Sequence, residues 1–128
     1  MERRTVPGES VEQVEDEVQS ILDDLSTDDP AFDATCEVAF ARQPFEADPD
    51  GEVAHAVRAA GTDVLGHVPP DAGQTFWTDA ALHQAAGTDT VVLGPVGGGL
   101  HTTEEWVDLD SVVQLADILA RTARQYCA

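Results

Sequence analysis

A stretch of glycine and proline late in the chain most limits what this sequence can fold into. Residues 94–99 are Gly-Pro-Val-Gly-Gly-Gly, and they follow an apolar run whose composition predicts a buried strand at 89–93. Such a stretch continues neither a strand nor a helix, so the chain has to leave the sheet there. The next helical pattern begins at Asp108, which places His101 in a loop between a strand and a helix. Ligands of open α/β sheets bind at the carboxyl ends of strands, so this loop is the candidate site.

His101 is the candidate metal ligand of that loop. Imidazole is a common ligand of zinc, and a neighbouring carboxylate can orient the ring by accepting a hydrogen bond from it. We expect Glu105 either to be that acceptor or to tie the loop to the following helix, and Glu104 to be a solvated acid. On spacing alone, a single histidine in a glycine-rich loop is more often a surface or packing residue than a ligand.

The first third of the chain predicts a strand, a helix and a second strand. Residues 2–6 are expected to form the first strand, which Pro7-Gly8 ends. Ser10 and Gln13 have the spacing of a capping box, and an amphipathic helical pattern follows them. Apolar residues then alternate with others over 34–40, which predicts a strand with one face exposed. These elements form a predicted β-α-β unit over residues 1–45.

The rest of the chain predicts further alternation of helices and strands. Residues 46–52 are rich in turn formers and predict a linker. The patterns after it predict an α/β fold with a parallel or mixed sheet over 53–128. Its expected elements are a helix at about 51–60, a strand at about 63–66, a helix capped by Thr78 and ending at Gly87, the strand at 89–93, and a helix at 108–126.

The charge of the chain is its most unusual bulk property. The chain has 25 acidic residues, six arginines and no lysine, which gives a net charge of −19. The acidic residues are spread over its whole length. A hydrophobic content of 42% is normal for a folded protein. We therefore expect adaptation to high salt, where self-repulsion is screened; the alternative is an acidic protein of ordinary salt. Nucleic acid is excluded as a partner, because no basic surface could neutralise phosphates.

Other features bear on location. No apolar run approaches the roughly 18 residues of a membrane span, and the first residues lack the apolar region of a signal peptide. Cys36 and Cys127 are too few and too isolated for a disulfide framework. The sequence therefore predicts a cytoplasmic protein with reduced thiols and no membrane partner.

Motifs in order along the whole chain resemble the C-terminal part of one family of zinc hydrolases. This is the acetylornithine deacetylase, succinyl-diaminopimelate desuccinylase and glutamate carboxypeptidase family. Two departures are Glu2, where the family has Asp, and Val96, where glycine is commoner. The matching motifs are Arg4 with Pro7-Gly8 of the lid-domain strand and turn, Thr78-Asp79-Ala80 at a helix start, Gly94-Pro95 after a strand, and His101 four residues before Glu105.

The resemblance implies a fold and an activity. Residues 1–45 would be the end of a lid or dimerisation domain, and residues 53–128 the end of a catalytic domain. The activity would be that of a metal-dependent amidohydrolase or metallopeptidase, with zinc or cobalt as cofactor. Its substrates would be N-acyl amino acids or peptides cleaved at a C-terminal bond. We also expect a homo-oligomer, because the strand at 89–93 is apolar on both faces and would lack a covering layer.

The resemblance also implies roles for single residues. His101 corresponds to the last metal ligand of the family, and Thr78 and Asp79 would lie near the substrate pocket. Arg4 would hold a substrate carboxylate through bidentate pairing. The alternative for Arg4 is a surface pair with Glu2 or Glu9. The other three histidines match no ligand position and are expected at the surface: His55, His67 and His83.

Most of the family's metal ligands have no counterpart in these 128 residues. No His-x-Asp pair occurs, and Glu104-Glu105 already belongs to the C-terminal motif. A catalytic zinc takes about three protein ligands, whereas this sequence offers one. We therefore expect the C-terminal third of a two-domain hydrolase, inactive and without metal when alone. The alternative is a stand-alone, non-catalytic dimerisation or scaffold domain, or the remnant of a disrupted gene.

Overall fold

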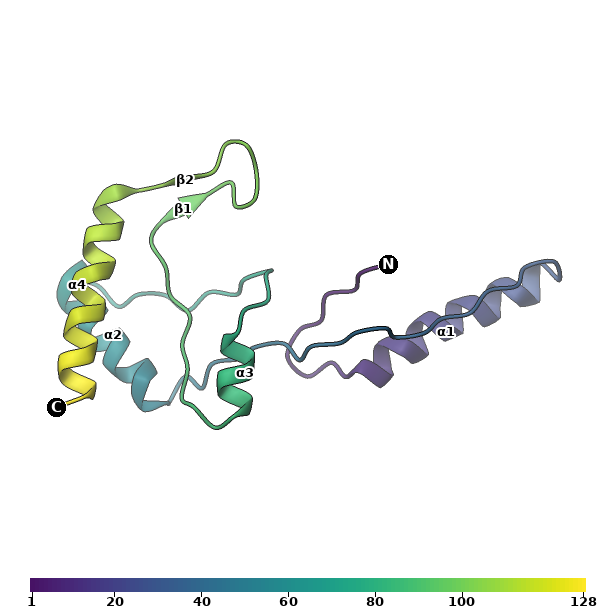
Figure 1. The fold of residues 1–128 in the computed structure, drawn as a ribbon, viewed down its shortest axis with the longest axis horizontal. Coiled ribbons are helices and arrows are strands. Elements are labelled where there is room, and N and C mark those ends of the chain that lie inside the picture. The colour runs from purple at the N-terminus through teal and green to yellow at the C-terminus, as the bar shows by residue number, and fades with distance from the viewer. The chain divides into compact units, whose positions relative to one another are not determined.

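A computed structural model describes all residues from Met1 to Ala128 and divides them into two compact units (Figure 1). Unit 1 is Met1–Glu46 and unit 2 is Ala47–Ala128. The break between them falls in the segment 46–52. That unit 1 belongs to a lid domain and unit 2 to a catalytic domain stays a prediction. Every helix is too short or too polar to span a lipid bilayer.

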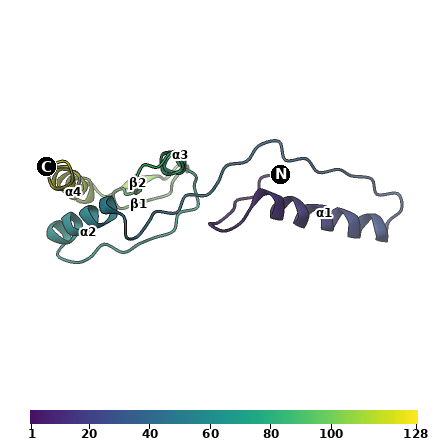
Figure 2. The same ribbon diagram turned by 90° about the horizontal axis from the view of Figure 1, so that it is seen from below.

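Unit 1 is built on one long helix, α1 (Val11–Asp28). The predicted capping box is present: Gln13 N–H donates to Ser10 Oγ at 3.2 Å, and Ser10 N–H donates to the Gln13 side chain at 2.8 Å. Glu9 closes the preceding turn by accepting from Val6 N–H at 2.7 Å. That backbone hydrogen bond, with the nearby Arg3 guanidinium, lowers the pKa of Glu9. After α1 the chain turns and runs back along the helix (Figures 1 and 2).

The strands predicted at 2–6 and 34–40 are not formed, so the β-α-β prediction for 1–45 was wrong. Alternating apolar residues favour an extended backbone, but a strand also needs a neighbour to pair with its N–H and C=O groups. Neither segment has such a neighbour in unit 1. Their side chains are correspondingly open to solvent, and Phe40 is 72% exposed.

Unit 2 is mainly helical, with α2 (Glu52–Leu65), α3 (Ala80–Ala85) and α4 (Leu109–Tyr126). The structure confirms the predicted terminal helix, and α2 and α4 pack side by side (Figure 2). α2 runs further than the predicted 51–60, to Leu65, and its C-cap Gly66 has a left-handed φ of 77°. The helix therefore includes most of residues 63–66. The strand predicted there was wrong, because Val64 and Leu65 continue the helix.

The core of unit 2 is small. Four of its five buried apolar side chains are alanines, so the helices approach closely but bury little area. Ile118 of α4 is the one large apolar side chain among them, and it is 7% exposed. The five are Ala54, Ala56, Ala60, Ala80 and Ile118.

The only β-structure is a short hairpin of β1 (Gly97–Gly98) and β2 (Trp106–Val107). Its strands are antiparallel, with Gly97 opposite Val107 and Gly98 opposite Trp106. The strand predicted at 89–93 is absent, because this apolar segment has no strand beside it to pair with. The predicted α/β class therefore holds only marginally, and the structure is four helices with one hairpin.

Asp89 caps α2 from 36 residues away in the sequence. The N-cap of α2 is Gly51, which offers no side chain to the first N–H groups of the helix. Asp89 Oδ2 accepts from Val53 N–H at 2.8 Å and supplies the missing cap. Gly51 leaves room for it, since a Cβ there would lie 2.5 Å from Asp89 Oδ1.

We expect Asp89→Ala to lower the free energy of unfolding of unit 2 by about 1 kcal/mol, the usual value of an N-cap. Asp79→Ala is the matched control, since it removes the same charge from a side chain that makes no cap hydrogen bond. Urea unfolding followed by tryptophan fluorescence measures both, because Trp77 and Trp106 lie in unit 2. Equal losses for the two variants would contradict the capping role.

Candidate functional site

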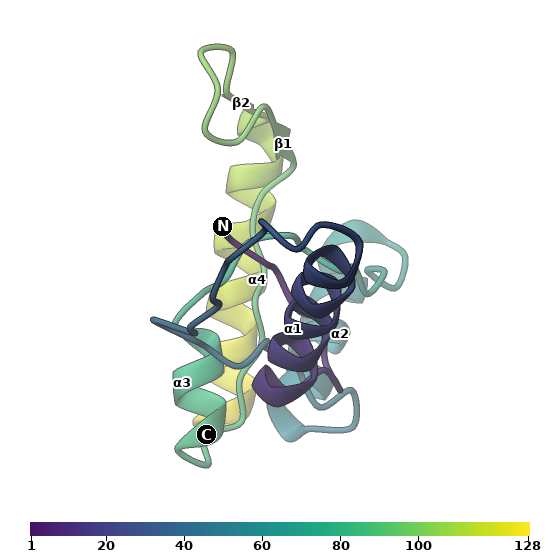
Figure 3. The ribbon, with the colours of Figure 1, turned by 90° about the vertical axis from the view of Figure 1, so that its right-hand side faces the viewer.

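The candidate site is the hairpin loop of unit 2, which begins at Gly99 and carries His101. The base of the hairpin is fixed to the start of α4 by two hydrogen bonds, and a third closes the N-cap of α4 beside them. Val96 N–H donates to Ser111 Oγ at 2.9 Å, and Asp108 N–H donates to Val96 O at 2.8 Å. Ser111 N–H in turn donates to the Asp108 carboxylate at 2.7 Å, and Ser111 is buried. The hairpin and α4 are therefore anchored to each other (Figures 1 and 3).

Close packing across the hairpin explains its run of glycines. A Cβ on Gly98 would lie 2.8 Å from Nε1 of Trp106. On Gly99 it would lie 2.6 Å from the carbonyl oxygen of Glu104, and the φ of Gly99 is also left-handed, at 69°. Any larger residue would push the two sides apart, so these glycines shape the loop without needing a chemical role.

His101 occupies a strained position in this loop. Its φ is 63°, and it is the only residue other than glycine with a positive φ. The turn beside it is held by Thr102, whose N–H and hydroxyl both donate to Gly99 O, at 2.9 and 2.7 Å. The imidazole is exposed and makes no hydrogen bond. Strain of this kind gathers at functional sites, so the geometry suits a ring presented to a ligand.

The loop lies in a different setting from the one predicted. The sequence predicts that His101 follows a strand at 89–93 and precedes the last helix, whereas it lies between β1 and β2. Glu104 and Glu105 are both exposed, and no hydrogen bond joins Glu105 to the His101 ring. The pairing of Trp106 with Gly98 was not predicted from the sequence. The sequence feature that could have predicted this pairing is the apolar pair Trp106-Val107, which directly follows the polar turn.

The other predicted site residues lie in other segments of the chain. Thr78 Oγ1 accepts from Ala80 N–H at 3.2 Å at the start of α3, and Asp79 beside it is exposed. Arg4 lies in unit 1, where its Nε donates to Glu2 Oε1 at 2.9 Å. That pair is the surface arrangement given above as the alternative for Arg4.

These residues do not by themselves fit a metal ion. No group of three or more His, Cys, Asp or Glu side chains in the structure is placed to hold one. A catalytic zinc needs about three protein ligands, and His101 is a single donor. Any metal that His101 binds would need ligands besides these residues.

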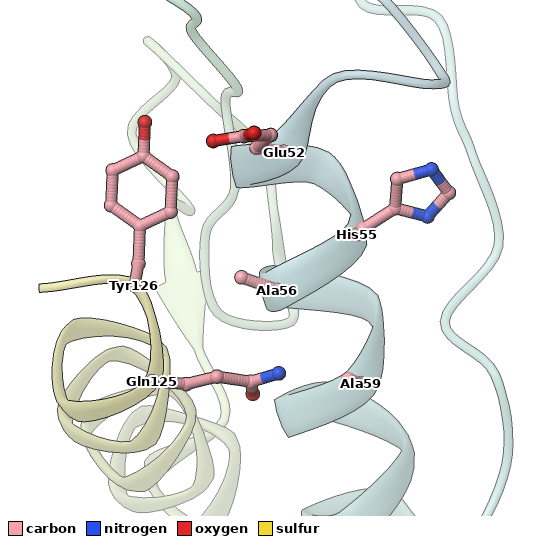
Figure 4. Close-up of a pocket in the computed structure, with 6 residues that line it drawn as sticks. All are labelled: Glu52, His55, Ala56, Ala59, Gln125 and Tyr126. Carbon is pink, nitrogen blue, oxygen red and sulfur yellow. The ribbon is translucent and has the colours of Figure 1, made fainter. Parts of the chain in front are cut away.

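An open groove of about 500 Å³ lies between the start of α2 and the end of α4 (Figure 4). Glu52 points toward Tyr126 across it, while His55 points away from both. It lies at the opposite end of α4 from the His101 loop, and a helix of 18 residues is about 27 Å long. The groove is therefore separate from the candidate site. Its lining residues are Glu52, His55, Ala56, Ala59, Gln125 and Tyr126.

Comparison with known proteins confirms the resemblance at the level of the family. The chain belongs to peptidase family M20/M25/M40, whose sequence profile matches residues 5–125. Enzymes of this family use zinc. The chain is similar to the acetylornithine deacetylase of Myxococcus xanthus, with 29% identity over 130 residues. That match covers 99% of this chain and 32% of the relative, so the chain spans about a third of that protein's length. No solved structure matches the chain significantly.

Proposed function

We propose that this chain supplies the C-terminal part of a metal-dependent amide hydrolase that cleaves N-acyl amino acids or C-terminal peptide bonds. The observation that carries the proposal is the placement of His101 in a chain that belongs to the M20 family. His101 is exposed and has a left-handed backbone in a loop that close packing restricts to glycines. The name of the relative, an acetylornithine deacetylase, supports a substrate with an acylated amino group.

His101 would provide one ligand to the metal, zinc or cobalt. Because the described residues offer no second or third ligand near it, the remaining ligands and the general base would come from outside them. Glu105 stands close in sequence and would orient the imidazole once a metal fixes the loop. The chain alone would then retain no metal.

Three further residues would act on the substrate. Thr78, which is half-buried, and Asp79, which is exposed, directly precede α3 and would shape the pocket. The Arg4 guanidinium would bind a substrate carboxylate in place of its present partner, Glu2. The protein would be a cytoplasmic homo-oligomer, with a small N-acyl amino acid or peptide as its substrate.

Reading the coding DNA ahead of the first codon tests this proposal. We expect sequences encoding His-x-Asp and Glu-Glu pairs there, in the same frame or an adjacent one. Expressed together with these residues as one protein, they should give zinc-dependent hydrolysis of N-acetyl amino acids. His101→Ala should reduce that rate to background, and His83→Ala, which changes an exposed histidine of α3, should preserve it.

Two results would contradict the proposal. Absence of both motifs from that DNA would favour a stand-alone dimerisation or scaffold domain. Hydrolysis that survives His101→Ala would show that this imidazole is not a metal ligand.

A further inference from the structure

Helix α1 carries a high negative charge with almost nothing to balance it. Seven of its 18 residues are acidic and none is basic. Several lie three or four positions apart, where like charges on a helix destabilise it. The seven are Glu12, Glu15, Asp16, Glu17, Asp23, Asp24 and Asp28.

The charges at the end of α1 are also placed against the helix dipole. The last turn contains Asp28 and no basic residue, and Asp29 follows it as the C-cap. A helix C-terminus carries partial negative charge, so carboxylates there are unfavourable. Glu12 in the first turn is favourably placed, and its own backbone N–H lowers its pKa. This favourable interaction lies at the N-terminus of α1 and does not offset the carboxylates at its C-terminus.

The arginines of unit 1 mostly contact residues outside α1. Arg3 lies 2.7 Å from Glu9, ahead of the helix, and reaches α1 only at Glu17, at 3.6 Å. Arg4 pairs with Glu2, and Arg42 lies over the Phe40 ring at 4.3 Å. With 13 acidic residues and three arginines, unit 1 has a net charge of −10 in 46 residues. Unit 2 has 12 and three, which is −9 in 82 residues, about half that charge per residue.

Unit 1 has little buried apolar surface to offset this repulsion. No residue of α1 is buried, and Ile21 and Leu25 on its apolar side are 58% and 45% exposed. All five buried apolar side chains of the chain lie in unit 2. The fold of unit 1 therefore depends on conditions that weaken repulsion between carboxylates.

We infer that unit 1 is an ionic-strength switch: α1 is ordered in molar salt and melts in dilute buffer, at a salt concentration where unit 2 is still folded. The Debye length falls from about 10 Å at 0.1 M to about 3 Å at 1 M, below the roughly 5–6 Å that separates neighbouring side chains on a helix. Salt thus screens the contacts that destabilise α1. This inference does not depend on the proposed function.

Each unit has its own probe. Both tryptophans, Trp77 and Trp106, lie in unit 2, so their fluorescence follows unit 2 alone. Cys36 is half-buried in unit 1, and Cys127→Ser removes the other thiol. In the full chain carrying Cys127→Ser, labelling of Cys36 with a neutral thiol reagent should slow by at least about tenfold from dilute buffer to molar KCl. The salt midpoint of this protection should lie above the midpoint of the fluorescence change.

Charge variants separate screening from other effects of salt. Asp23→Asn with Asp24→Asn and Asp28→Asn should move the Cys36 midpoint to lower salt. Equal neutralisation in unit 2, by Asp50→Asn with Asp63→Asn and Asp79→Asn, should leave it in place. Three results would overturn the inference: Cys36 labelling that is independent of KCl, a shared midpoint for both probes, or protection by sucrose, which strengthens burial without screening charge, as strong as that by KCl.

Discussion

Replacing Ile118 by alanine is expected to lower the free energy of unfolding of unit 2 by about 2–5 kcal/mol, the range for truncating a large buried aliphatic side chain. α4 packs on α2, and Ile118 is the only buried apolar side chain that α4 contributes. The other buried apolar side chains are alanines, which bury little area themselves. A loss of this size is a large part of the roughly 5–15 kcal/mol that stabilises a typical domain.

Val113→Ala is the matched control for this prediction, because Val113 lies on the same helix and is 70% exposed. Urea unfolding in molar KCl, followed by tryptophan fluorescence, reports on unit 2 for both variants. We expect a change within about 0.5 kcal/mol for Val113→Ala, as is usual for surface substitutions. Similar losses for the two variants would mean that Ile118 is not the centre of the core.

The elements that the sequence predicts well are those whose signals are local. Ser10 and Gln13 are three residues apart, and their capping box places the start of α1 correctly. The pattern after Asp108 likewise predicts α4 to within a residue. A helix forms its hydrogen bonds within its own segment, so a short stretch of sequence contains most of the information needed.

The predicted strands failed because a strand is not a local structure. Residues 34–40 and 89–93 have the composition of strands, but their N–H and C=O groups need partners from another segment. No other segment of this chain provides them. The two strands that do form pair across a short loop, and two of their four residues are glycines, which no strand propensity would select.

In unit 2 as well, features with a local sequence signal could be predicted and features that depend on distant residues could not. The glycines and His101 stand out in the sequence, so the loop could be predicted, and its left-handed histidine agrees with a special backbone position. The cap that Asp89 gives α2 could not be predicted, because the two groups are 36 residues apart and no pattern links them. The ligand role of His101 itself stays a prediction, since its sequence signal is a family motif and the other members of that motif, such as a His-x-Asp pair, do not occur in these residues.

We propose that His101 is one ligand of a metal site that these residues do not complete. We expect the purified chain, in molar KCl with added zinc, to hydrolyse N-acetyl amino acids no faster than zinc alone. The physical reason is the number of ligands, since one imidazole cannot hold a catalytic zinc that takes about three protein ligands. Enzymes accelerate such reactions by about a millionfold or more, so a complete site would be unmistakable.

The decisive experiment compares the rate of hydrolysis by the chain alone with that of His101→Ala, with circular dichroism to show that both proteins are folded. We predict the zinc-only rate for both proteins. Zinc-dependent turnover by the unaltered chain that disappears in His101→Ala would contradict the claim, because it would mean that these residues form a complete catalytic centre.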